Sequence, residues 1–426
     1  MPTKPDQQRA TAARMLAAVV SHRQTSDQVL GRFPADPLTR DLFYGAMRHY
    51  FTLTRAVNAE LTKPLRDKDE IIGFLLIVGA YQLRHTRIPD HAAIHATVDA
   101  CKALKKTSVS GLVNAVLRTL QRRPDQTERS FSSVEDEFPE WMVGLIRRDF
   151  PDIADDILNA SQQRAPLTLR INRRRSTTEG YRALLDAQGI GYAPAFRDEC
   201  LVLDEPIATA ALPGFDEGLV AIQDAGAGFV VDLLACQSGD RVLDACAAPG
   251  GKLFHLLESH PDIHPIGVEK SARRMQRLHM EARRLGHRPA THTADATSLD
   301  WWDGMPFDAV LIDAPCSGSG TLRRHPDIKI LRTEADLAGY AQLQSALLSN
   351  LWRTLRLGGS LLYCTCSLFA EENDAVIADF VRATDNATVR NIAIPTGVER
   401  KFGWQVLPTN RTTDGFYFSL LNKGTA

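Results

Sequence analysis

The chain has 426 residues, of which 44% are hydrophobic and 24% charged, and its formal net charge at pH 7 is -1. This composition is typical of globular proteins and excludes a disordered chain, and the length predicts roughly two to four domains. The seven cysteines are scattered and odd in number, which argues against a disulfide framework, and no second Cys or His pair stands near Cys364 and Cys366 to complete a metal site.

The longest apolar run, residues 71–81, is about half a membrane span and predicts a buried helix. The apolar stretch near the start, residues 15–20, is too short for a secretory signal and lacks a cleavage site. We therefore expect a cytoplasmic, monomeric protein with no membrane segment and no metal.

Apolar residues recur at helical spacing through residues 1–122, and prolines mark the breaks, which predicts an all-helical domain over residues 1–125. Residues 1–130 hold 20 Lys and Arg against 12 Asp and Glu, a net charge of +8, whereas the remainder has a net charge of −9. The basic region, including Lys102, Lys105 and Lys106, is suited to face RNA phosphates. A solvated helical surface explains the same charges equally well.

Residues 123–138 are polar and without periodicity, which indicates a linker. Helical patterns then cover 139–162 and 178–188, and β-like segments cover 167–172 and 191–203. This mixture predicts a small α+β domain over residues 135–220.

From residue 221 to 426 strand and helix patterns alternate. Strands are expected at 241–245, 265–269, 291–294, 309–313, 360–365 and 416–421, and helices at 251–258, 272–286, 336–355 and 372–383. Alternation of this kind predicts an α/β, Rossmann-like domain whose mostly parallel sheet is covered on both faces.

Small residues follow the first of these strands, and a carboxylate stands at or just after the end of each of the first three: Asp244, Glu269 and Asp295. Small residues let a backbone approach a ligand closely, and ligands bind beyond the carboxyl ends of parallel strands. The fingerprints of dinucleotide and P-loop sites are absent, which favours a nucleoside without a pyrophosphate, such as S-adenosylmethionine. The alternative is a tight turn that only packs the first helix.

Cys316 follows the fourth strand and Cys366 the fifth, so both are expected at the same edge of the sheet. Carbon 5 of cytosine is a poor nucleophile until a thiolate adds to carbon 6, and a second thiol suits release of the product. Asp313 is placed to hold the edge of such a base. The chemistry alone does not decide which cysteine is the nucleophile.

These segments resemble the Nop/Sun family of RNA cytosine-carbon-5 methyltransferases, and within it the bacterial small-subunit ribosomal RNA methyltransferase B subfamily. The likeness is carried by residues 244–252, 313–327, Thr365-Cys366-Ser367 with Glu371-Glu372-Asn373, 405–408 and 414–417. The helical region resembles NusB at residues 91–94 and 113–118, and residues 166–172 resemble the domain that precedes the catalytic domain in this subfamily.

The resemblance implies that Cys366 is the nucleophile, that Cys316 assists release, and that Asp313 belongs to both the catalytic and the cofactor site. It assigns S-adenosylmethionine to Cys246, Ala247, Ala248, Pro249, Gly250, Gly251, Lys252, Glu269, Asp295 and Asp313. Glu269 and Cys364 depart from the expected Asp and small residue.

The resemblance favours methylation of small-subunit ribosomal RNA. The same chemistry on transfer RNA and a non-catalytic RNA-binding assembly factor remain alternatives, and a dinucleotide-dependent oxidoreductase is disfavoured. Arg323, Arg324 and His325 are expected to grip phosphates beside the site.

Overall fold

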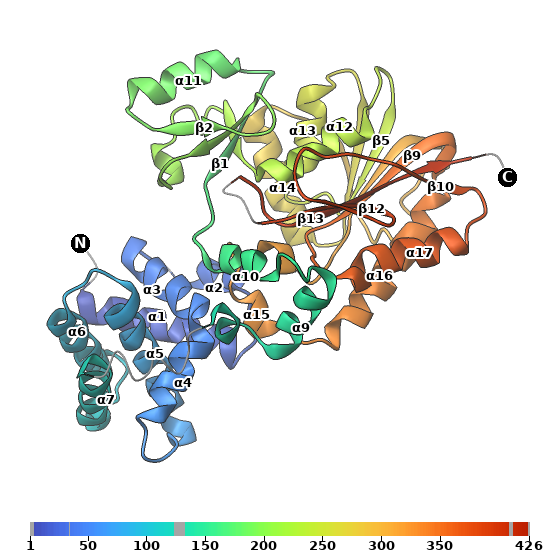
Figure 1. The fold of residues 1–426 in the computed structure, drawn as a ribbon. Coiled ribbons are helices and arrows are strands. Elements are labelled where there is room, and N and C mark those ends of the chain that lie inside the picture. Colours follow the sequence, from blue (N-terminus) through green and yellow to red (C-terminus); the bar gives the residue numbers. More distant parts are fainter. Residues whose placement is uncertain (1–3, 34, 123–132, 409–411, 425–426) are drawn as a thin grey trace. The chain divides into compact units, whose positions relative to one another are not determined.

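The computed structural model describes residues 4–33, 35–122, 133–408 and 412–424. The chain divides into two compact units, residues 1–163 with 322–334 and residues 164–321 with 335–426. Figure 1 shows helices throughout the first unit and two sheets in the second.

Within its described part, the first unit is all-helical, as predicted for the N-terminal region. Its helices begin at strong caps: Thr25 and Gln28 form a capping box, and the Asp36 carboxylate accepts the backbone N–H of Thr39 at 2.9 Å. The helices are α1 (Pro5–Val20), α2 (Ser26–Arg32), α3 (Pro37–Arg48), α4 (Tyr50–Ala59), α5 (Glu70–His85), α6 (Asp90–Ala103), α7 (Ser110–Arg122), α9 (Glu140–Asp149), α10 (Ala154–Gln162) and α15 (Ile328–Leu331).

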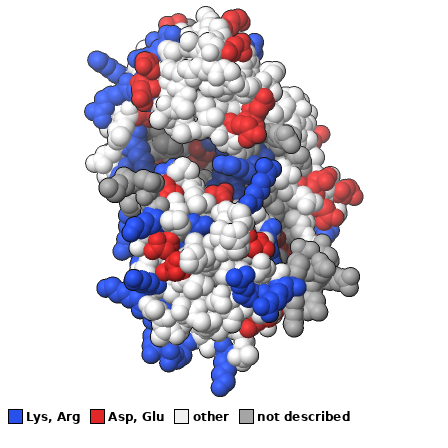
Figure 2. All heavy atoms as spheres, turned by 90° about the vertical axis from the view of Figure 1, so that its left-hand side faces the viewer, with Lys and Arg blue, Asp and Glu red and all other residues white. Residues whose placement is uncertain are grey.

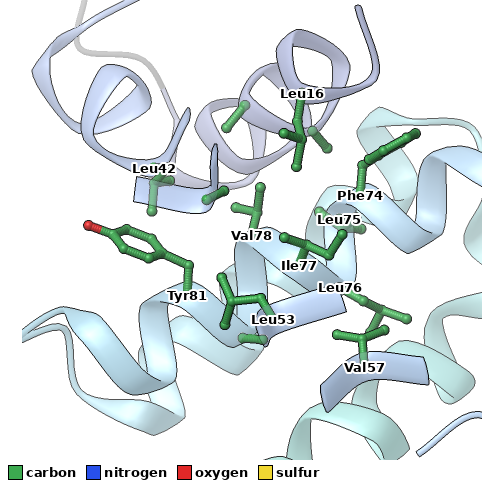
Figure 3. Packing of buried hydrophobic residues seen from close by; sticks show 14 of the residues in the cluster. Leu16, Leu42, Leu53, Val57, Phe74, Leu75, Leu76, Ile77, Val78 and Tyr81 are labelled. Carbon is green, nitrogen blue, oxygen red and sulfur yellow. The ribbon is translucent and has the colours of Figure 1, made fainter. Parts of the chain in front are cut away.

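The core of this unit forms around α5, the apolar run that was predicted to be a buried helix. Figure 3 shows Val78 of α5 among Leu16, Leu42 and Leu53, which come from three other helices. Burial of these side chains stabilises the unit, because each contributes about 1.5–3 kcal/mol when it leaves water.

The predicted linker is partly wrong. Residues 123–132 lie outside the described residues, but Val134–Glu137 form a short 3-10 helix, and the buried Glu137 side chain is fixed to the first unit. Its carboxylate lies 2.9 Å from Nδ1 of His49 and accepts the Thr52 hydroxyl at 2.7 Å. A polar segment without periodicity thus became ordered through tertiary hydrogen bonds that no sequence pattern shows.

The two units also divide the chain differently from the three domains expected. Helices α9 and α10 belong to the first unit and not with the small sheet, and so does the segment 322–334, which was expected in the catalytic domain. Asp327 accepts both the backbone N–H and the hydroxyl of Ser26, at 3.0 and 2.8 Å. The buried Lys329 donates to the carbonyls of Arg48 and Glu137 at 2.6 and 2.7 Å.

The smaller sheet of the second unit has four antiparallel strands in the order β2-β3-β1-β4. The elements are β1 (Thr168–Ile171), α11 (Thr178–Ala187), β2 (Tyr192–Pro194), β3 (Cys200–Leu203) and β4 (Val220–Ile222). The strands and the helix expected between residues 167 and 203 are confirmed.

The larger sheet has nine strands in the order β11-β12-β13-β9-β8-β5-β6-β7, with β10 paired to β13. The five strands from β7 to β9 are parallel and β10 to β13 are antiparallel. The strands are β5 (Arg241–Ala245), β6 (His264–Glu269), β7 (Ala290–Thr293), β8 (Phe307–Asp313), β9 (Leu355–Thr365), β10 (Ala387–Arg390), β11 (Val398–Arg400), β12 (Gly403–Val406) and β13 (Phe416–Lys423). The helices are α12 (Phe229–Leu234), α13 (Gly251–Ser259), α14 (Ala272–Leu285), α16 (Asp336–Trp352) and α17 (Asp374–Arg382).

Helices cover both faces of this sheet, as predicted (Figure 1). Alternate residues of each strand enter two separate cores: Val242 packs with α12, α13 and α14, and Leu243 packs with α16 and α17. The Rossmann-like α/β fold is therefore confirmed. Strands β10, β11 and β12 were not predicted; they form by antiparallel pairing with β13 or with one another, which a local pattern does not show.

Candidate active site

The two cysteines singled out from the sequence lie together. Cys316 follows β8, Cys366 follows β9, and these strands are parallel neighbours with Asp313 opposite Cys364. The two sulfur atoms are 3.4 Å apart, and both side chains are partly exposed. Their predicted convergence at one edge of the sheet is confirmed.

A buried carboxylate joins the two cysteine loops. Glu372 accepts the backbone N–H of Ser317 at 2.7 Å and the hydroxyl of Ser367 at 2.5 Å, and these serines directly follow Cys316 and Cys366. A second link is the backbone N–H of Gly320, which donates to the carbonyl of Cys366 at 2.8 Å. These hydrogen bonds fix the two loops to one another and thereby position the two sulfur atoms.

Charged groups gather beside the pair. The Lys252 ammonium lies 2.6 Å from Oδ2 of Asp313, whose Oδ1 accepts the Cys364 thiol at 3.4 Å. Burial opposes the charge on Lys252, but Asp313 raises its pKa above the ordinary value, so it stays protonated. Burial and the nearby Asp313 raise the pKa of Asp244 well above its usual range.

The loop between β5 and α13 has a backbone that a ligand can approach closely. Cys246 and Gly250 both have positive φ, +66° and +109°, and Gly250 immediately precedes the first turn of α13. A Cβ on Gly250 would meet the ring of Phe254 at 2.2 Å, so only glycine fits there.

A pocket of about 290 Å³ opens next to this loop. Cys246, Glu269 and Asp295 line it, together with apolar side chains of Val268, Ala294, Ala296, Pro315, Leu343 and Leu347. Asp295 is held by Lys270 at 2.6 Å and by Thr297, which lower its pKa to about 2. Glu269 Oε1 accepts the Ser271 N–H, while its Oε2 lies 3.1 Å from Arg274 without a hydrogen bond within the described structure.

The chain is similar to known proteins over most of its length. Residues 231–422 match the family model of the 16S rRNA methyltransferase RsmB/F, residues 6–122 the NusB family, and residues 138–210 the ferredoxin-like domain of RsmF/B-like methyltransferases. The chain is 39% identical to ribosomal RNA small subunit methyltransferase B of Shewanella oneidensis, over 91% of each chain. It is 37% identical to the protein of that name from Citrobacter koseri, over 97% of this chain and 98% of the relative.

The chain belongs to the ribosomal RNA small subunit methyltransferase B family. A solved methyltransferase homologue from Pyrococcus horikoshii has 25% sequence identity and a TM-score of 0.59, over 67% of this chain and 95% of that one. The resemblance to this subfamily and to NusB is therefore confirmed, and the chain is an enzyme of the methyltransferase class.

The residues expected to contact RNA differ in how exposed they are in the structure. Arg323 is only 2% exposed, which contradicts a surface grip by its guanidinium, while Arg324 and His325 are partly exposed. Lys102 and Lys105 are exposed, and Lys106 is paired with Asp69 at 2.9 Å. Figure 2 shows Lys and Arg on much of one face with Asp and Glu between them.

Sequence reasoning gave no role to Glu372, to Ser317 and Ser367, or to Arg170. Glu372 stands within a segment that carries the family resemblance, and an acid six residues after Cys366 was the available signal. Within the described chain, no helix is long and apolar enough to cross a membrane, and no group of three or more His, Cys, Asp or Glu is placed to hold a metal ion.

Proposed function

We propose that the protein methylates carbon 5 of a cytosine in small-subunit ribosomal RNA, using S-adenosylmethionine and a covalent bond between Cys366 and the base. The observation that carries the proposal is the pair of sulfur atoms, 3.4 Å apart, together with a pocket of about 290 Å³ whose lining combines apolar side chains with the carboxylates of Glu269 and Asp295. The names of the relatives, which align over almost their whole length, support the ribosomal substrate.

The residues of the pocket fit the methyl donor. Apolar side chains from β6, the loop after β7 and α16 provide walls for a flat base, and Asp295 stands at the rim as an acceptor for an exocyclic amino group. Glu269 Oε2 has acceptor capacity left for a ribose hydroxyl. When bound, S-adenosylmethionine supplies an electrophilic methyl group to the activated carbon 5. Residues 246–252, with Glu269, Asp295 and Asp313, would hold it.

The charges around the pair favour Cys366 as the nucleophile. Lys252 interacts electrostatically with Cys364 and, less strongly, with Cys366, and an ammonium near a thiolate stabilises it. The hydrogen bond to Cys366 and burial raise the pKa of the Cys316 thiol well above its ordinary value, and the Glu372 carboxylate raises it further. Cys316 is therefore expected to stay a neutral thiol.

In the proposed reaction the Cys366 thiolate forms a bond to carbon 6, and the electrons of the 5,6 double bond move toward the base edge. Asp313, with Lys252, holds that edge and steadies the charge there. After methylation, carbon 5 loses its proton to a proton acceptor. The 5,6 double bond of the cytosine forms again, and the bond from carbon 6 to sulfur breaks. Cys316, 3.4 Å from the departing sulfur, is positioned to assist this release.

The test combines two cysteine variants with a map of the product. Cys366→Ala should abolish methyl transfer while it leaves binding of S-adenosylmethionine unchanged within about twofold, because the sulfur is not needed to hold the donor. Cys316→Ala should accumulate an RNA–protein adduct that survives a denaturing gel. Bisulfite sequencing of ribosomal and transfer RNA from a deletion strain should show one lost 5-methylcytosine in small-subunit RNA.

An adduct formed by Cys366→Ala and not by Cys316→Ala would reverse the two roles. A modified cytosine lost only from transfer RNA would replace the substrate, and unchanged methylation in the deletion strain would contradict the activity. Cys236→Ala, at a buried cysteine outside the site, is the matched control and should keep wild-type activity.

A further inference from the structure

Glu372 is the last residue of a 3-10 helix, Ala370–Glu372, that precedes α17, and it is fully buried, which is rare for a carboxylate. The groups around it are donors: the Ser317 N–H at 2.7 Å, the Ser367 hydroxyl at 2.5 Å and the Gln344 amide at 3.3 Å from its oxygens. Burial raises its pKa and the two serines oppose that rise. These three donors point at the two oxygens of Glu372, and such hydrogen bonds stabilise the ionised form, which only accepts.

The position of this charge is not symmetric between the two cysteines. The carboxylate binds the backbone N–H that follows Cys316 directly, but it reaches the Cys366 loop only through a neutral hydroxyl. On the other side, Lys252 forms an ion pair with Asp313 and interacts electrostatically with Cys364 and, less strongly, with Cys366. The direct link of the Glu372 carboxylate is therefore to the backbone of the Cys316 loop.

We propose that Glu372 is a positioning residue that locks both cysteine loops and, by its charge, decides which of the two sulfurs is the thiolate. This inference rests on the proposed function, because it explains how two equivalent thiols acquire different roles. With the carboxylate in place, Cys316 keeps its proton and can donate it toward Cys366, and Cys366 carries the charge. Without the Glu372 carboxylate, the negative charge that keeps Cys316 protonated is absent.

Alkylation of the free protein by limiting iodoacetamide tests this charge without RNA or methyl donor. The thiolate displaces iodide and forms a carbon–sulfur bond, so the ratio of modified Cys366 to modified Cys316, read by peptide mass spectrometry, reports which sulfur is charged. Both side chains are partly exposed, so the reagent can reach either. Wild type should be modified mainly at Cys366.

Glu372→Gln keeps the shape and removes the charge, and it should lower that ratio about tenfold, which corresponds to one pKa unit between the two thiols. It should also lower kcat about tenfold with little change in KM for RNA. Glu372→Asp restores the charge and should return the ratio toward wild type. Glu399→Gln removes an exposed charge of β11 and should leave the ratio unchanged.

Equal modification of the two cysteines in wild type, or an unchanged ratio in folded Glu372→Gln, would overturn the inference. Equal modification in wild type would overturn the inference even if the variant does not fold. Failure of the proposed function appears differently, as the absence of any RNA adduct or 5-methylcytosine, and the alkylation ratio remains measurable in that case.

Discussion

Arg170 of β1 is buried, as is its partner Glu258 of α13, and each side chain is only 1% exposed. Nε and NH2 of Arg170 donate to the two carboxylate oxygens at 2.9 Å each, and NH1 donates to the carbonyl of Gly251 at 2.6 Å. One guanidinium thus joins the small sheet to the helix that begins at the glycine-rich loop. Bidentate geometry of this kind gives the strong form of the interaction.

Arg170→Met should lower the free energy of unfolding by about 3–5 kcal/mol, because it removes the guanidinium from a buried carboxylate whose interaction with His287 remains. This is a large share of the roughly 5–15 kcal/mol that stabilises a typical domain. Urea unfolding at pH 7, followed by fluorescence and circular dichroism, measures the loss. Arg182→Met, which removes the more exposed pair with Asp198, is the matched control and should change stability by less than about 1 kcal/mol.

The pH dependence gives a second check. Burial opposes ionisation of Glu258, but Arg170 and His287 lower its pKa below the ordinary 4.5 in the wild type. Its contribution is therefore present above pH 4.5 and is lost as the pH falls through the folded-state pKa. In Arg170→Met the unpaired carboxylate takes up a proton at a higher pH, so the difference from wild type should shrink on acidification. A difference under about 1 kcal/mol at pH 7, or one that grows as the pH falls, would refute this reasoning.

Three further outcomes are expected. Asp295→Ala should weaken binding of S-adenosylmethionine about tenfold in calorimetry, since it removes a partly exposed acceptor that lines the pocket, and unchanged affinity would contradict its placement in the donor site. Lys329→Met should lower the melting temperature, because the carbonyls of Arg48 and Glu137 lose their buried amine donor at a cost of about 1–3 kcal/mol, and an unchanged melting curve would show that water replaces it. Lys102→Glu with Lys105→Glu should weaken RNA binding and flatten its dependence on salt; equal affinity would mean that this part of the helical surface is merely solvated.

The sequence by itself determined the layers of the catalytic domain and the place of its chemistry. Periodic apolar residues specify β5, β8 and β9, and in a parallel sheet the residues after such strands must meet at one edge. The sequence therefore predicted that Cys316 and Cys366 lie close together. The same alternation predicted the helices α13, α14, α16 and α17. Local patterns suffice wherever each residue's environment depends on its own strand or helix.

Only the tertiary structure decided the features that join distant segments. The assignment of residues 322–334 to the helical unit depends on buried hydrogen bonds of Asp327 and Lys329, and charged residues are ordinarily read as surface. The same holds for Arg170 with Glu258 and for Glu372 between the two cysteine loops. A buried charge is stable only where its partners converge from other parts of the chain, and that convergence is a property of the fold and not of the local sequence.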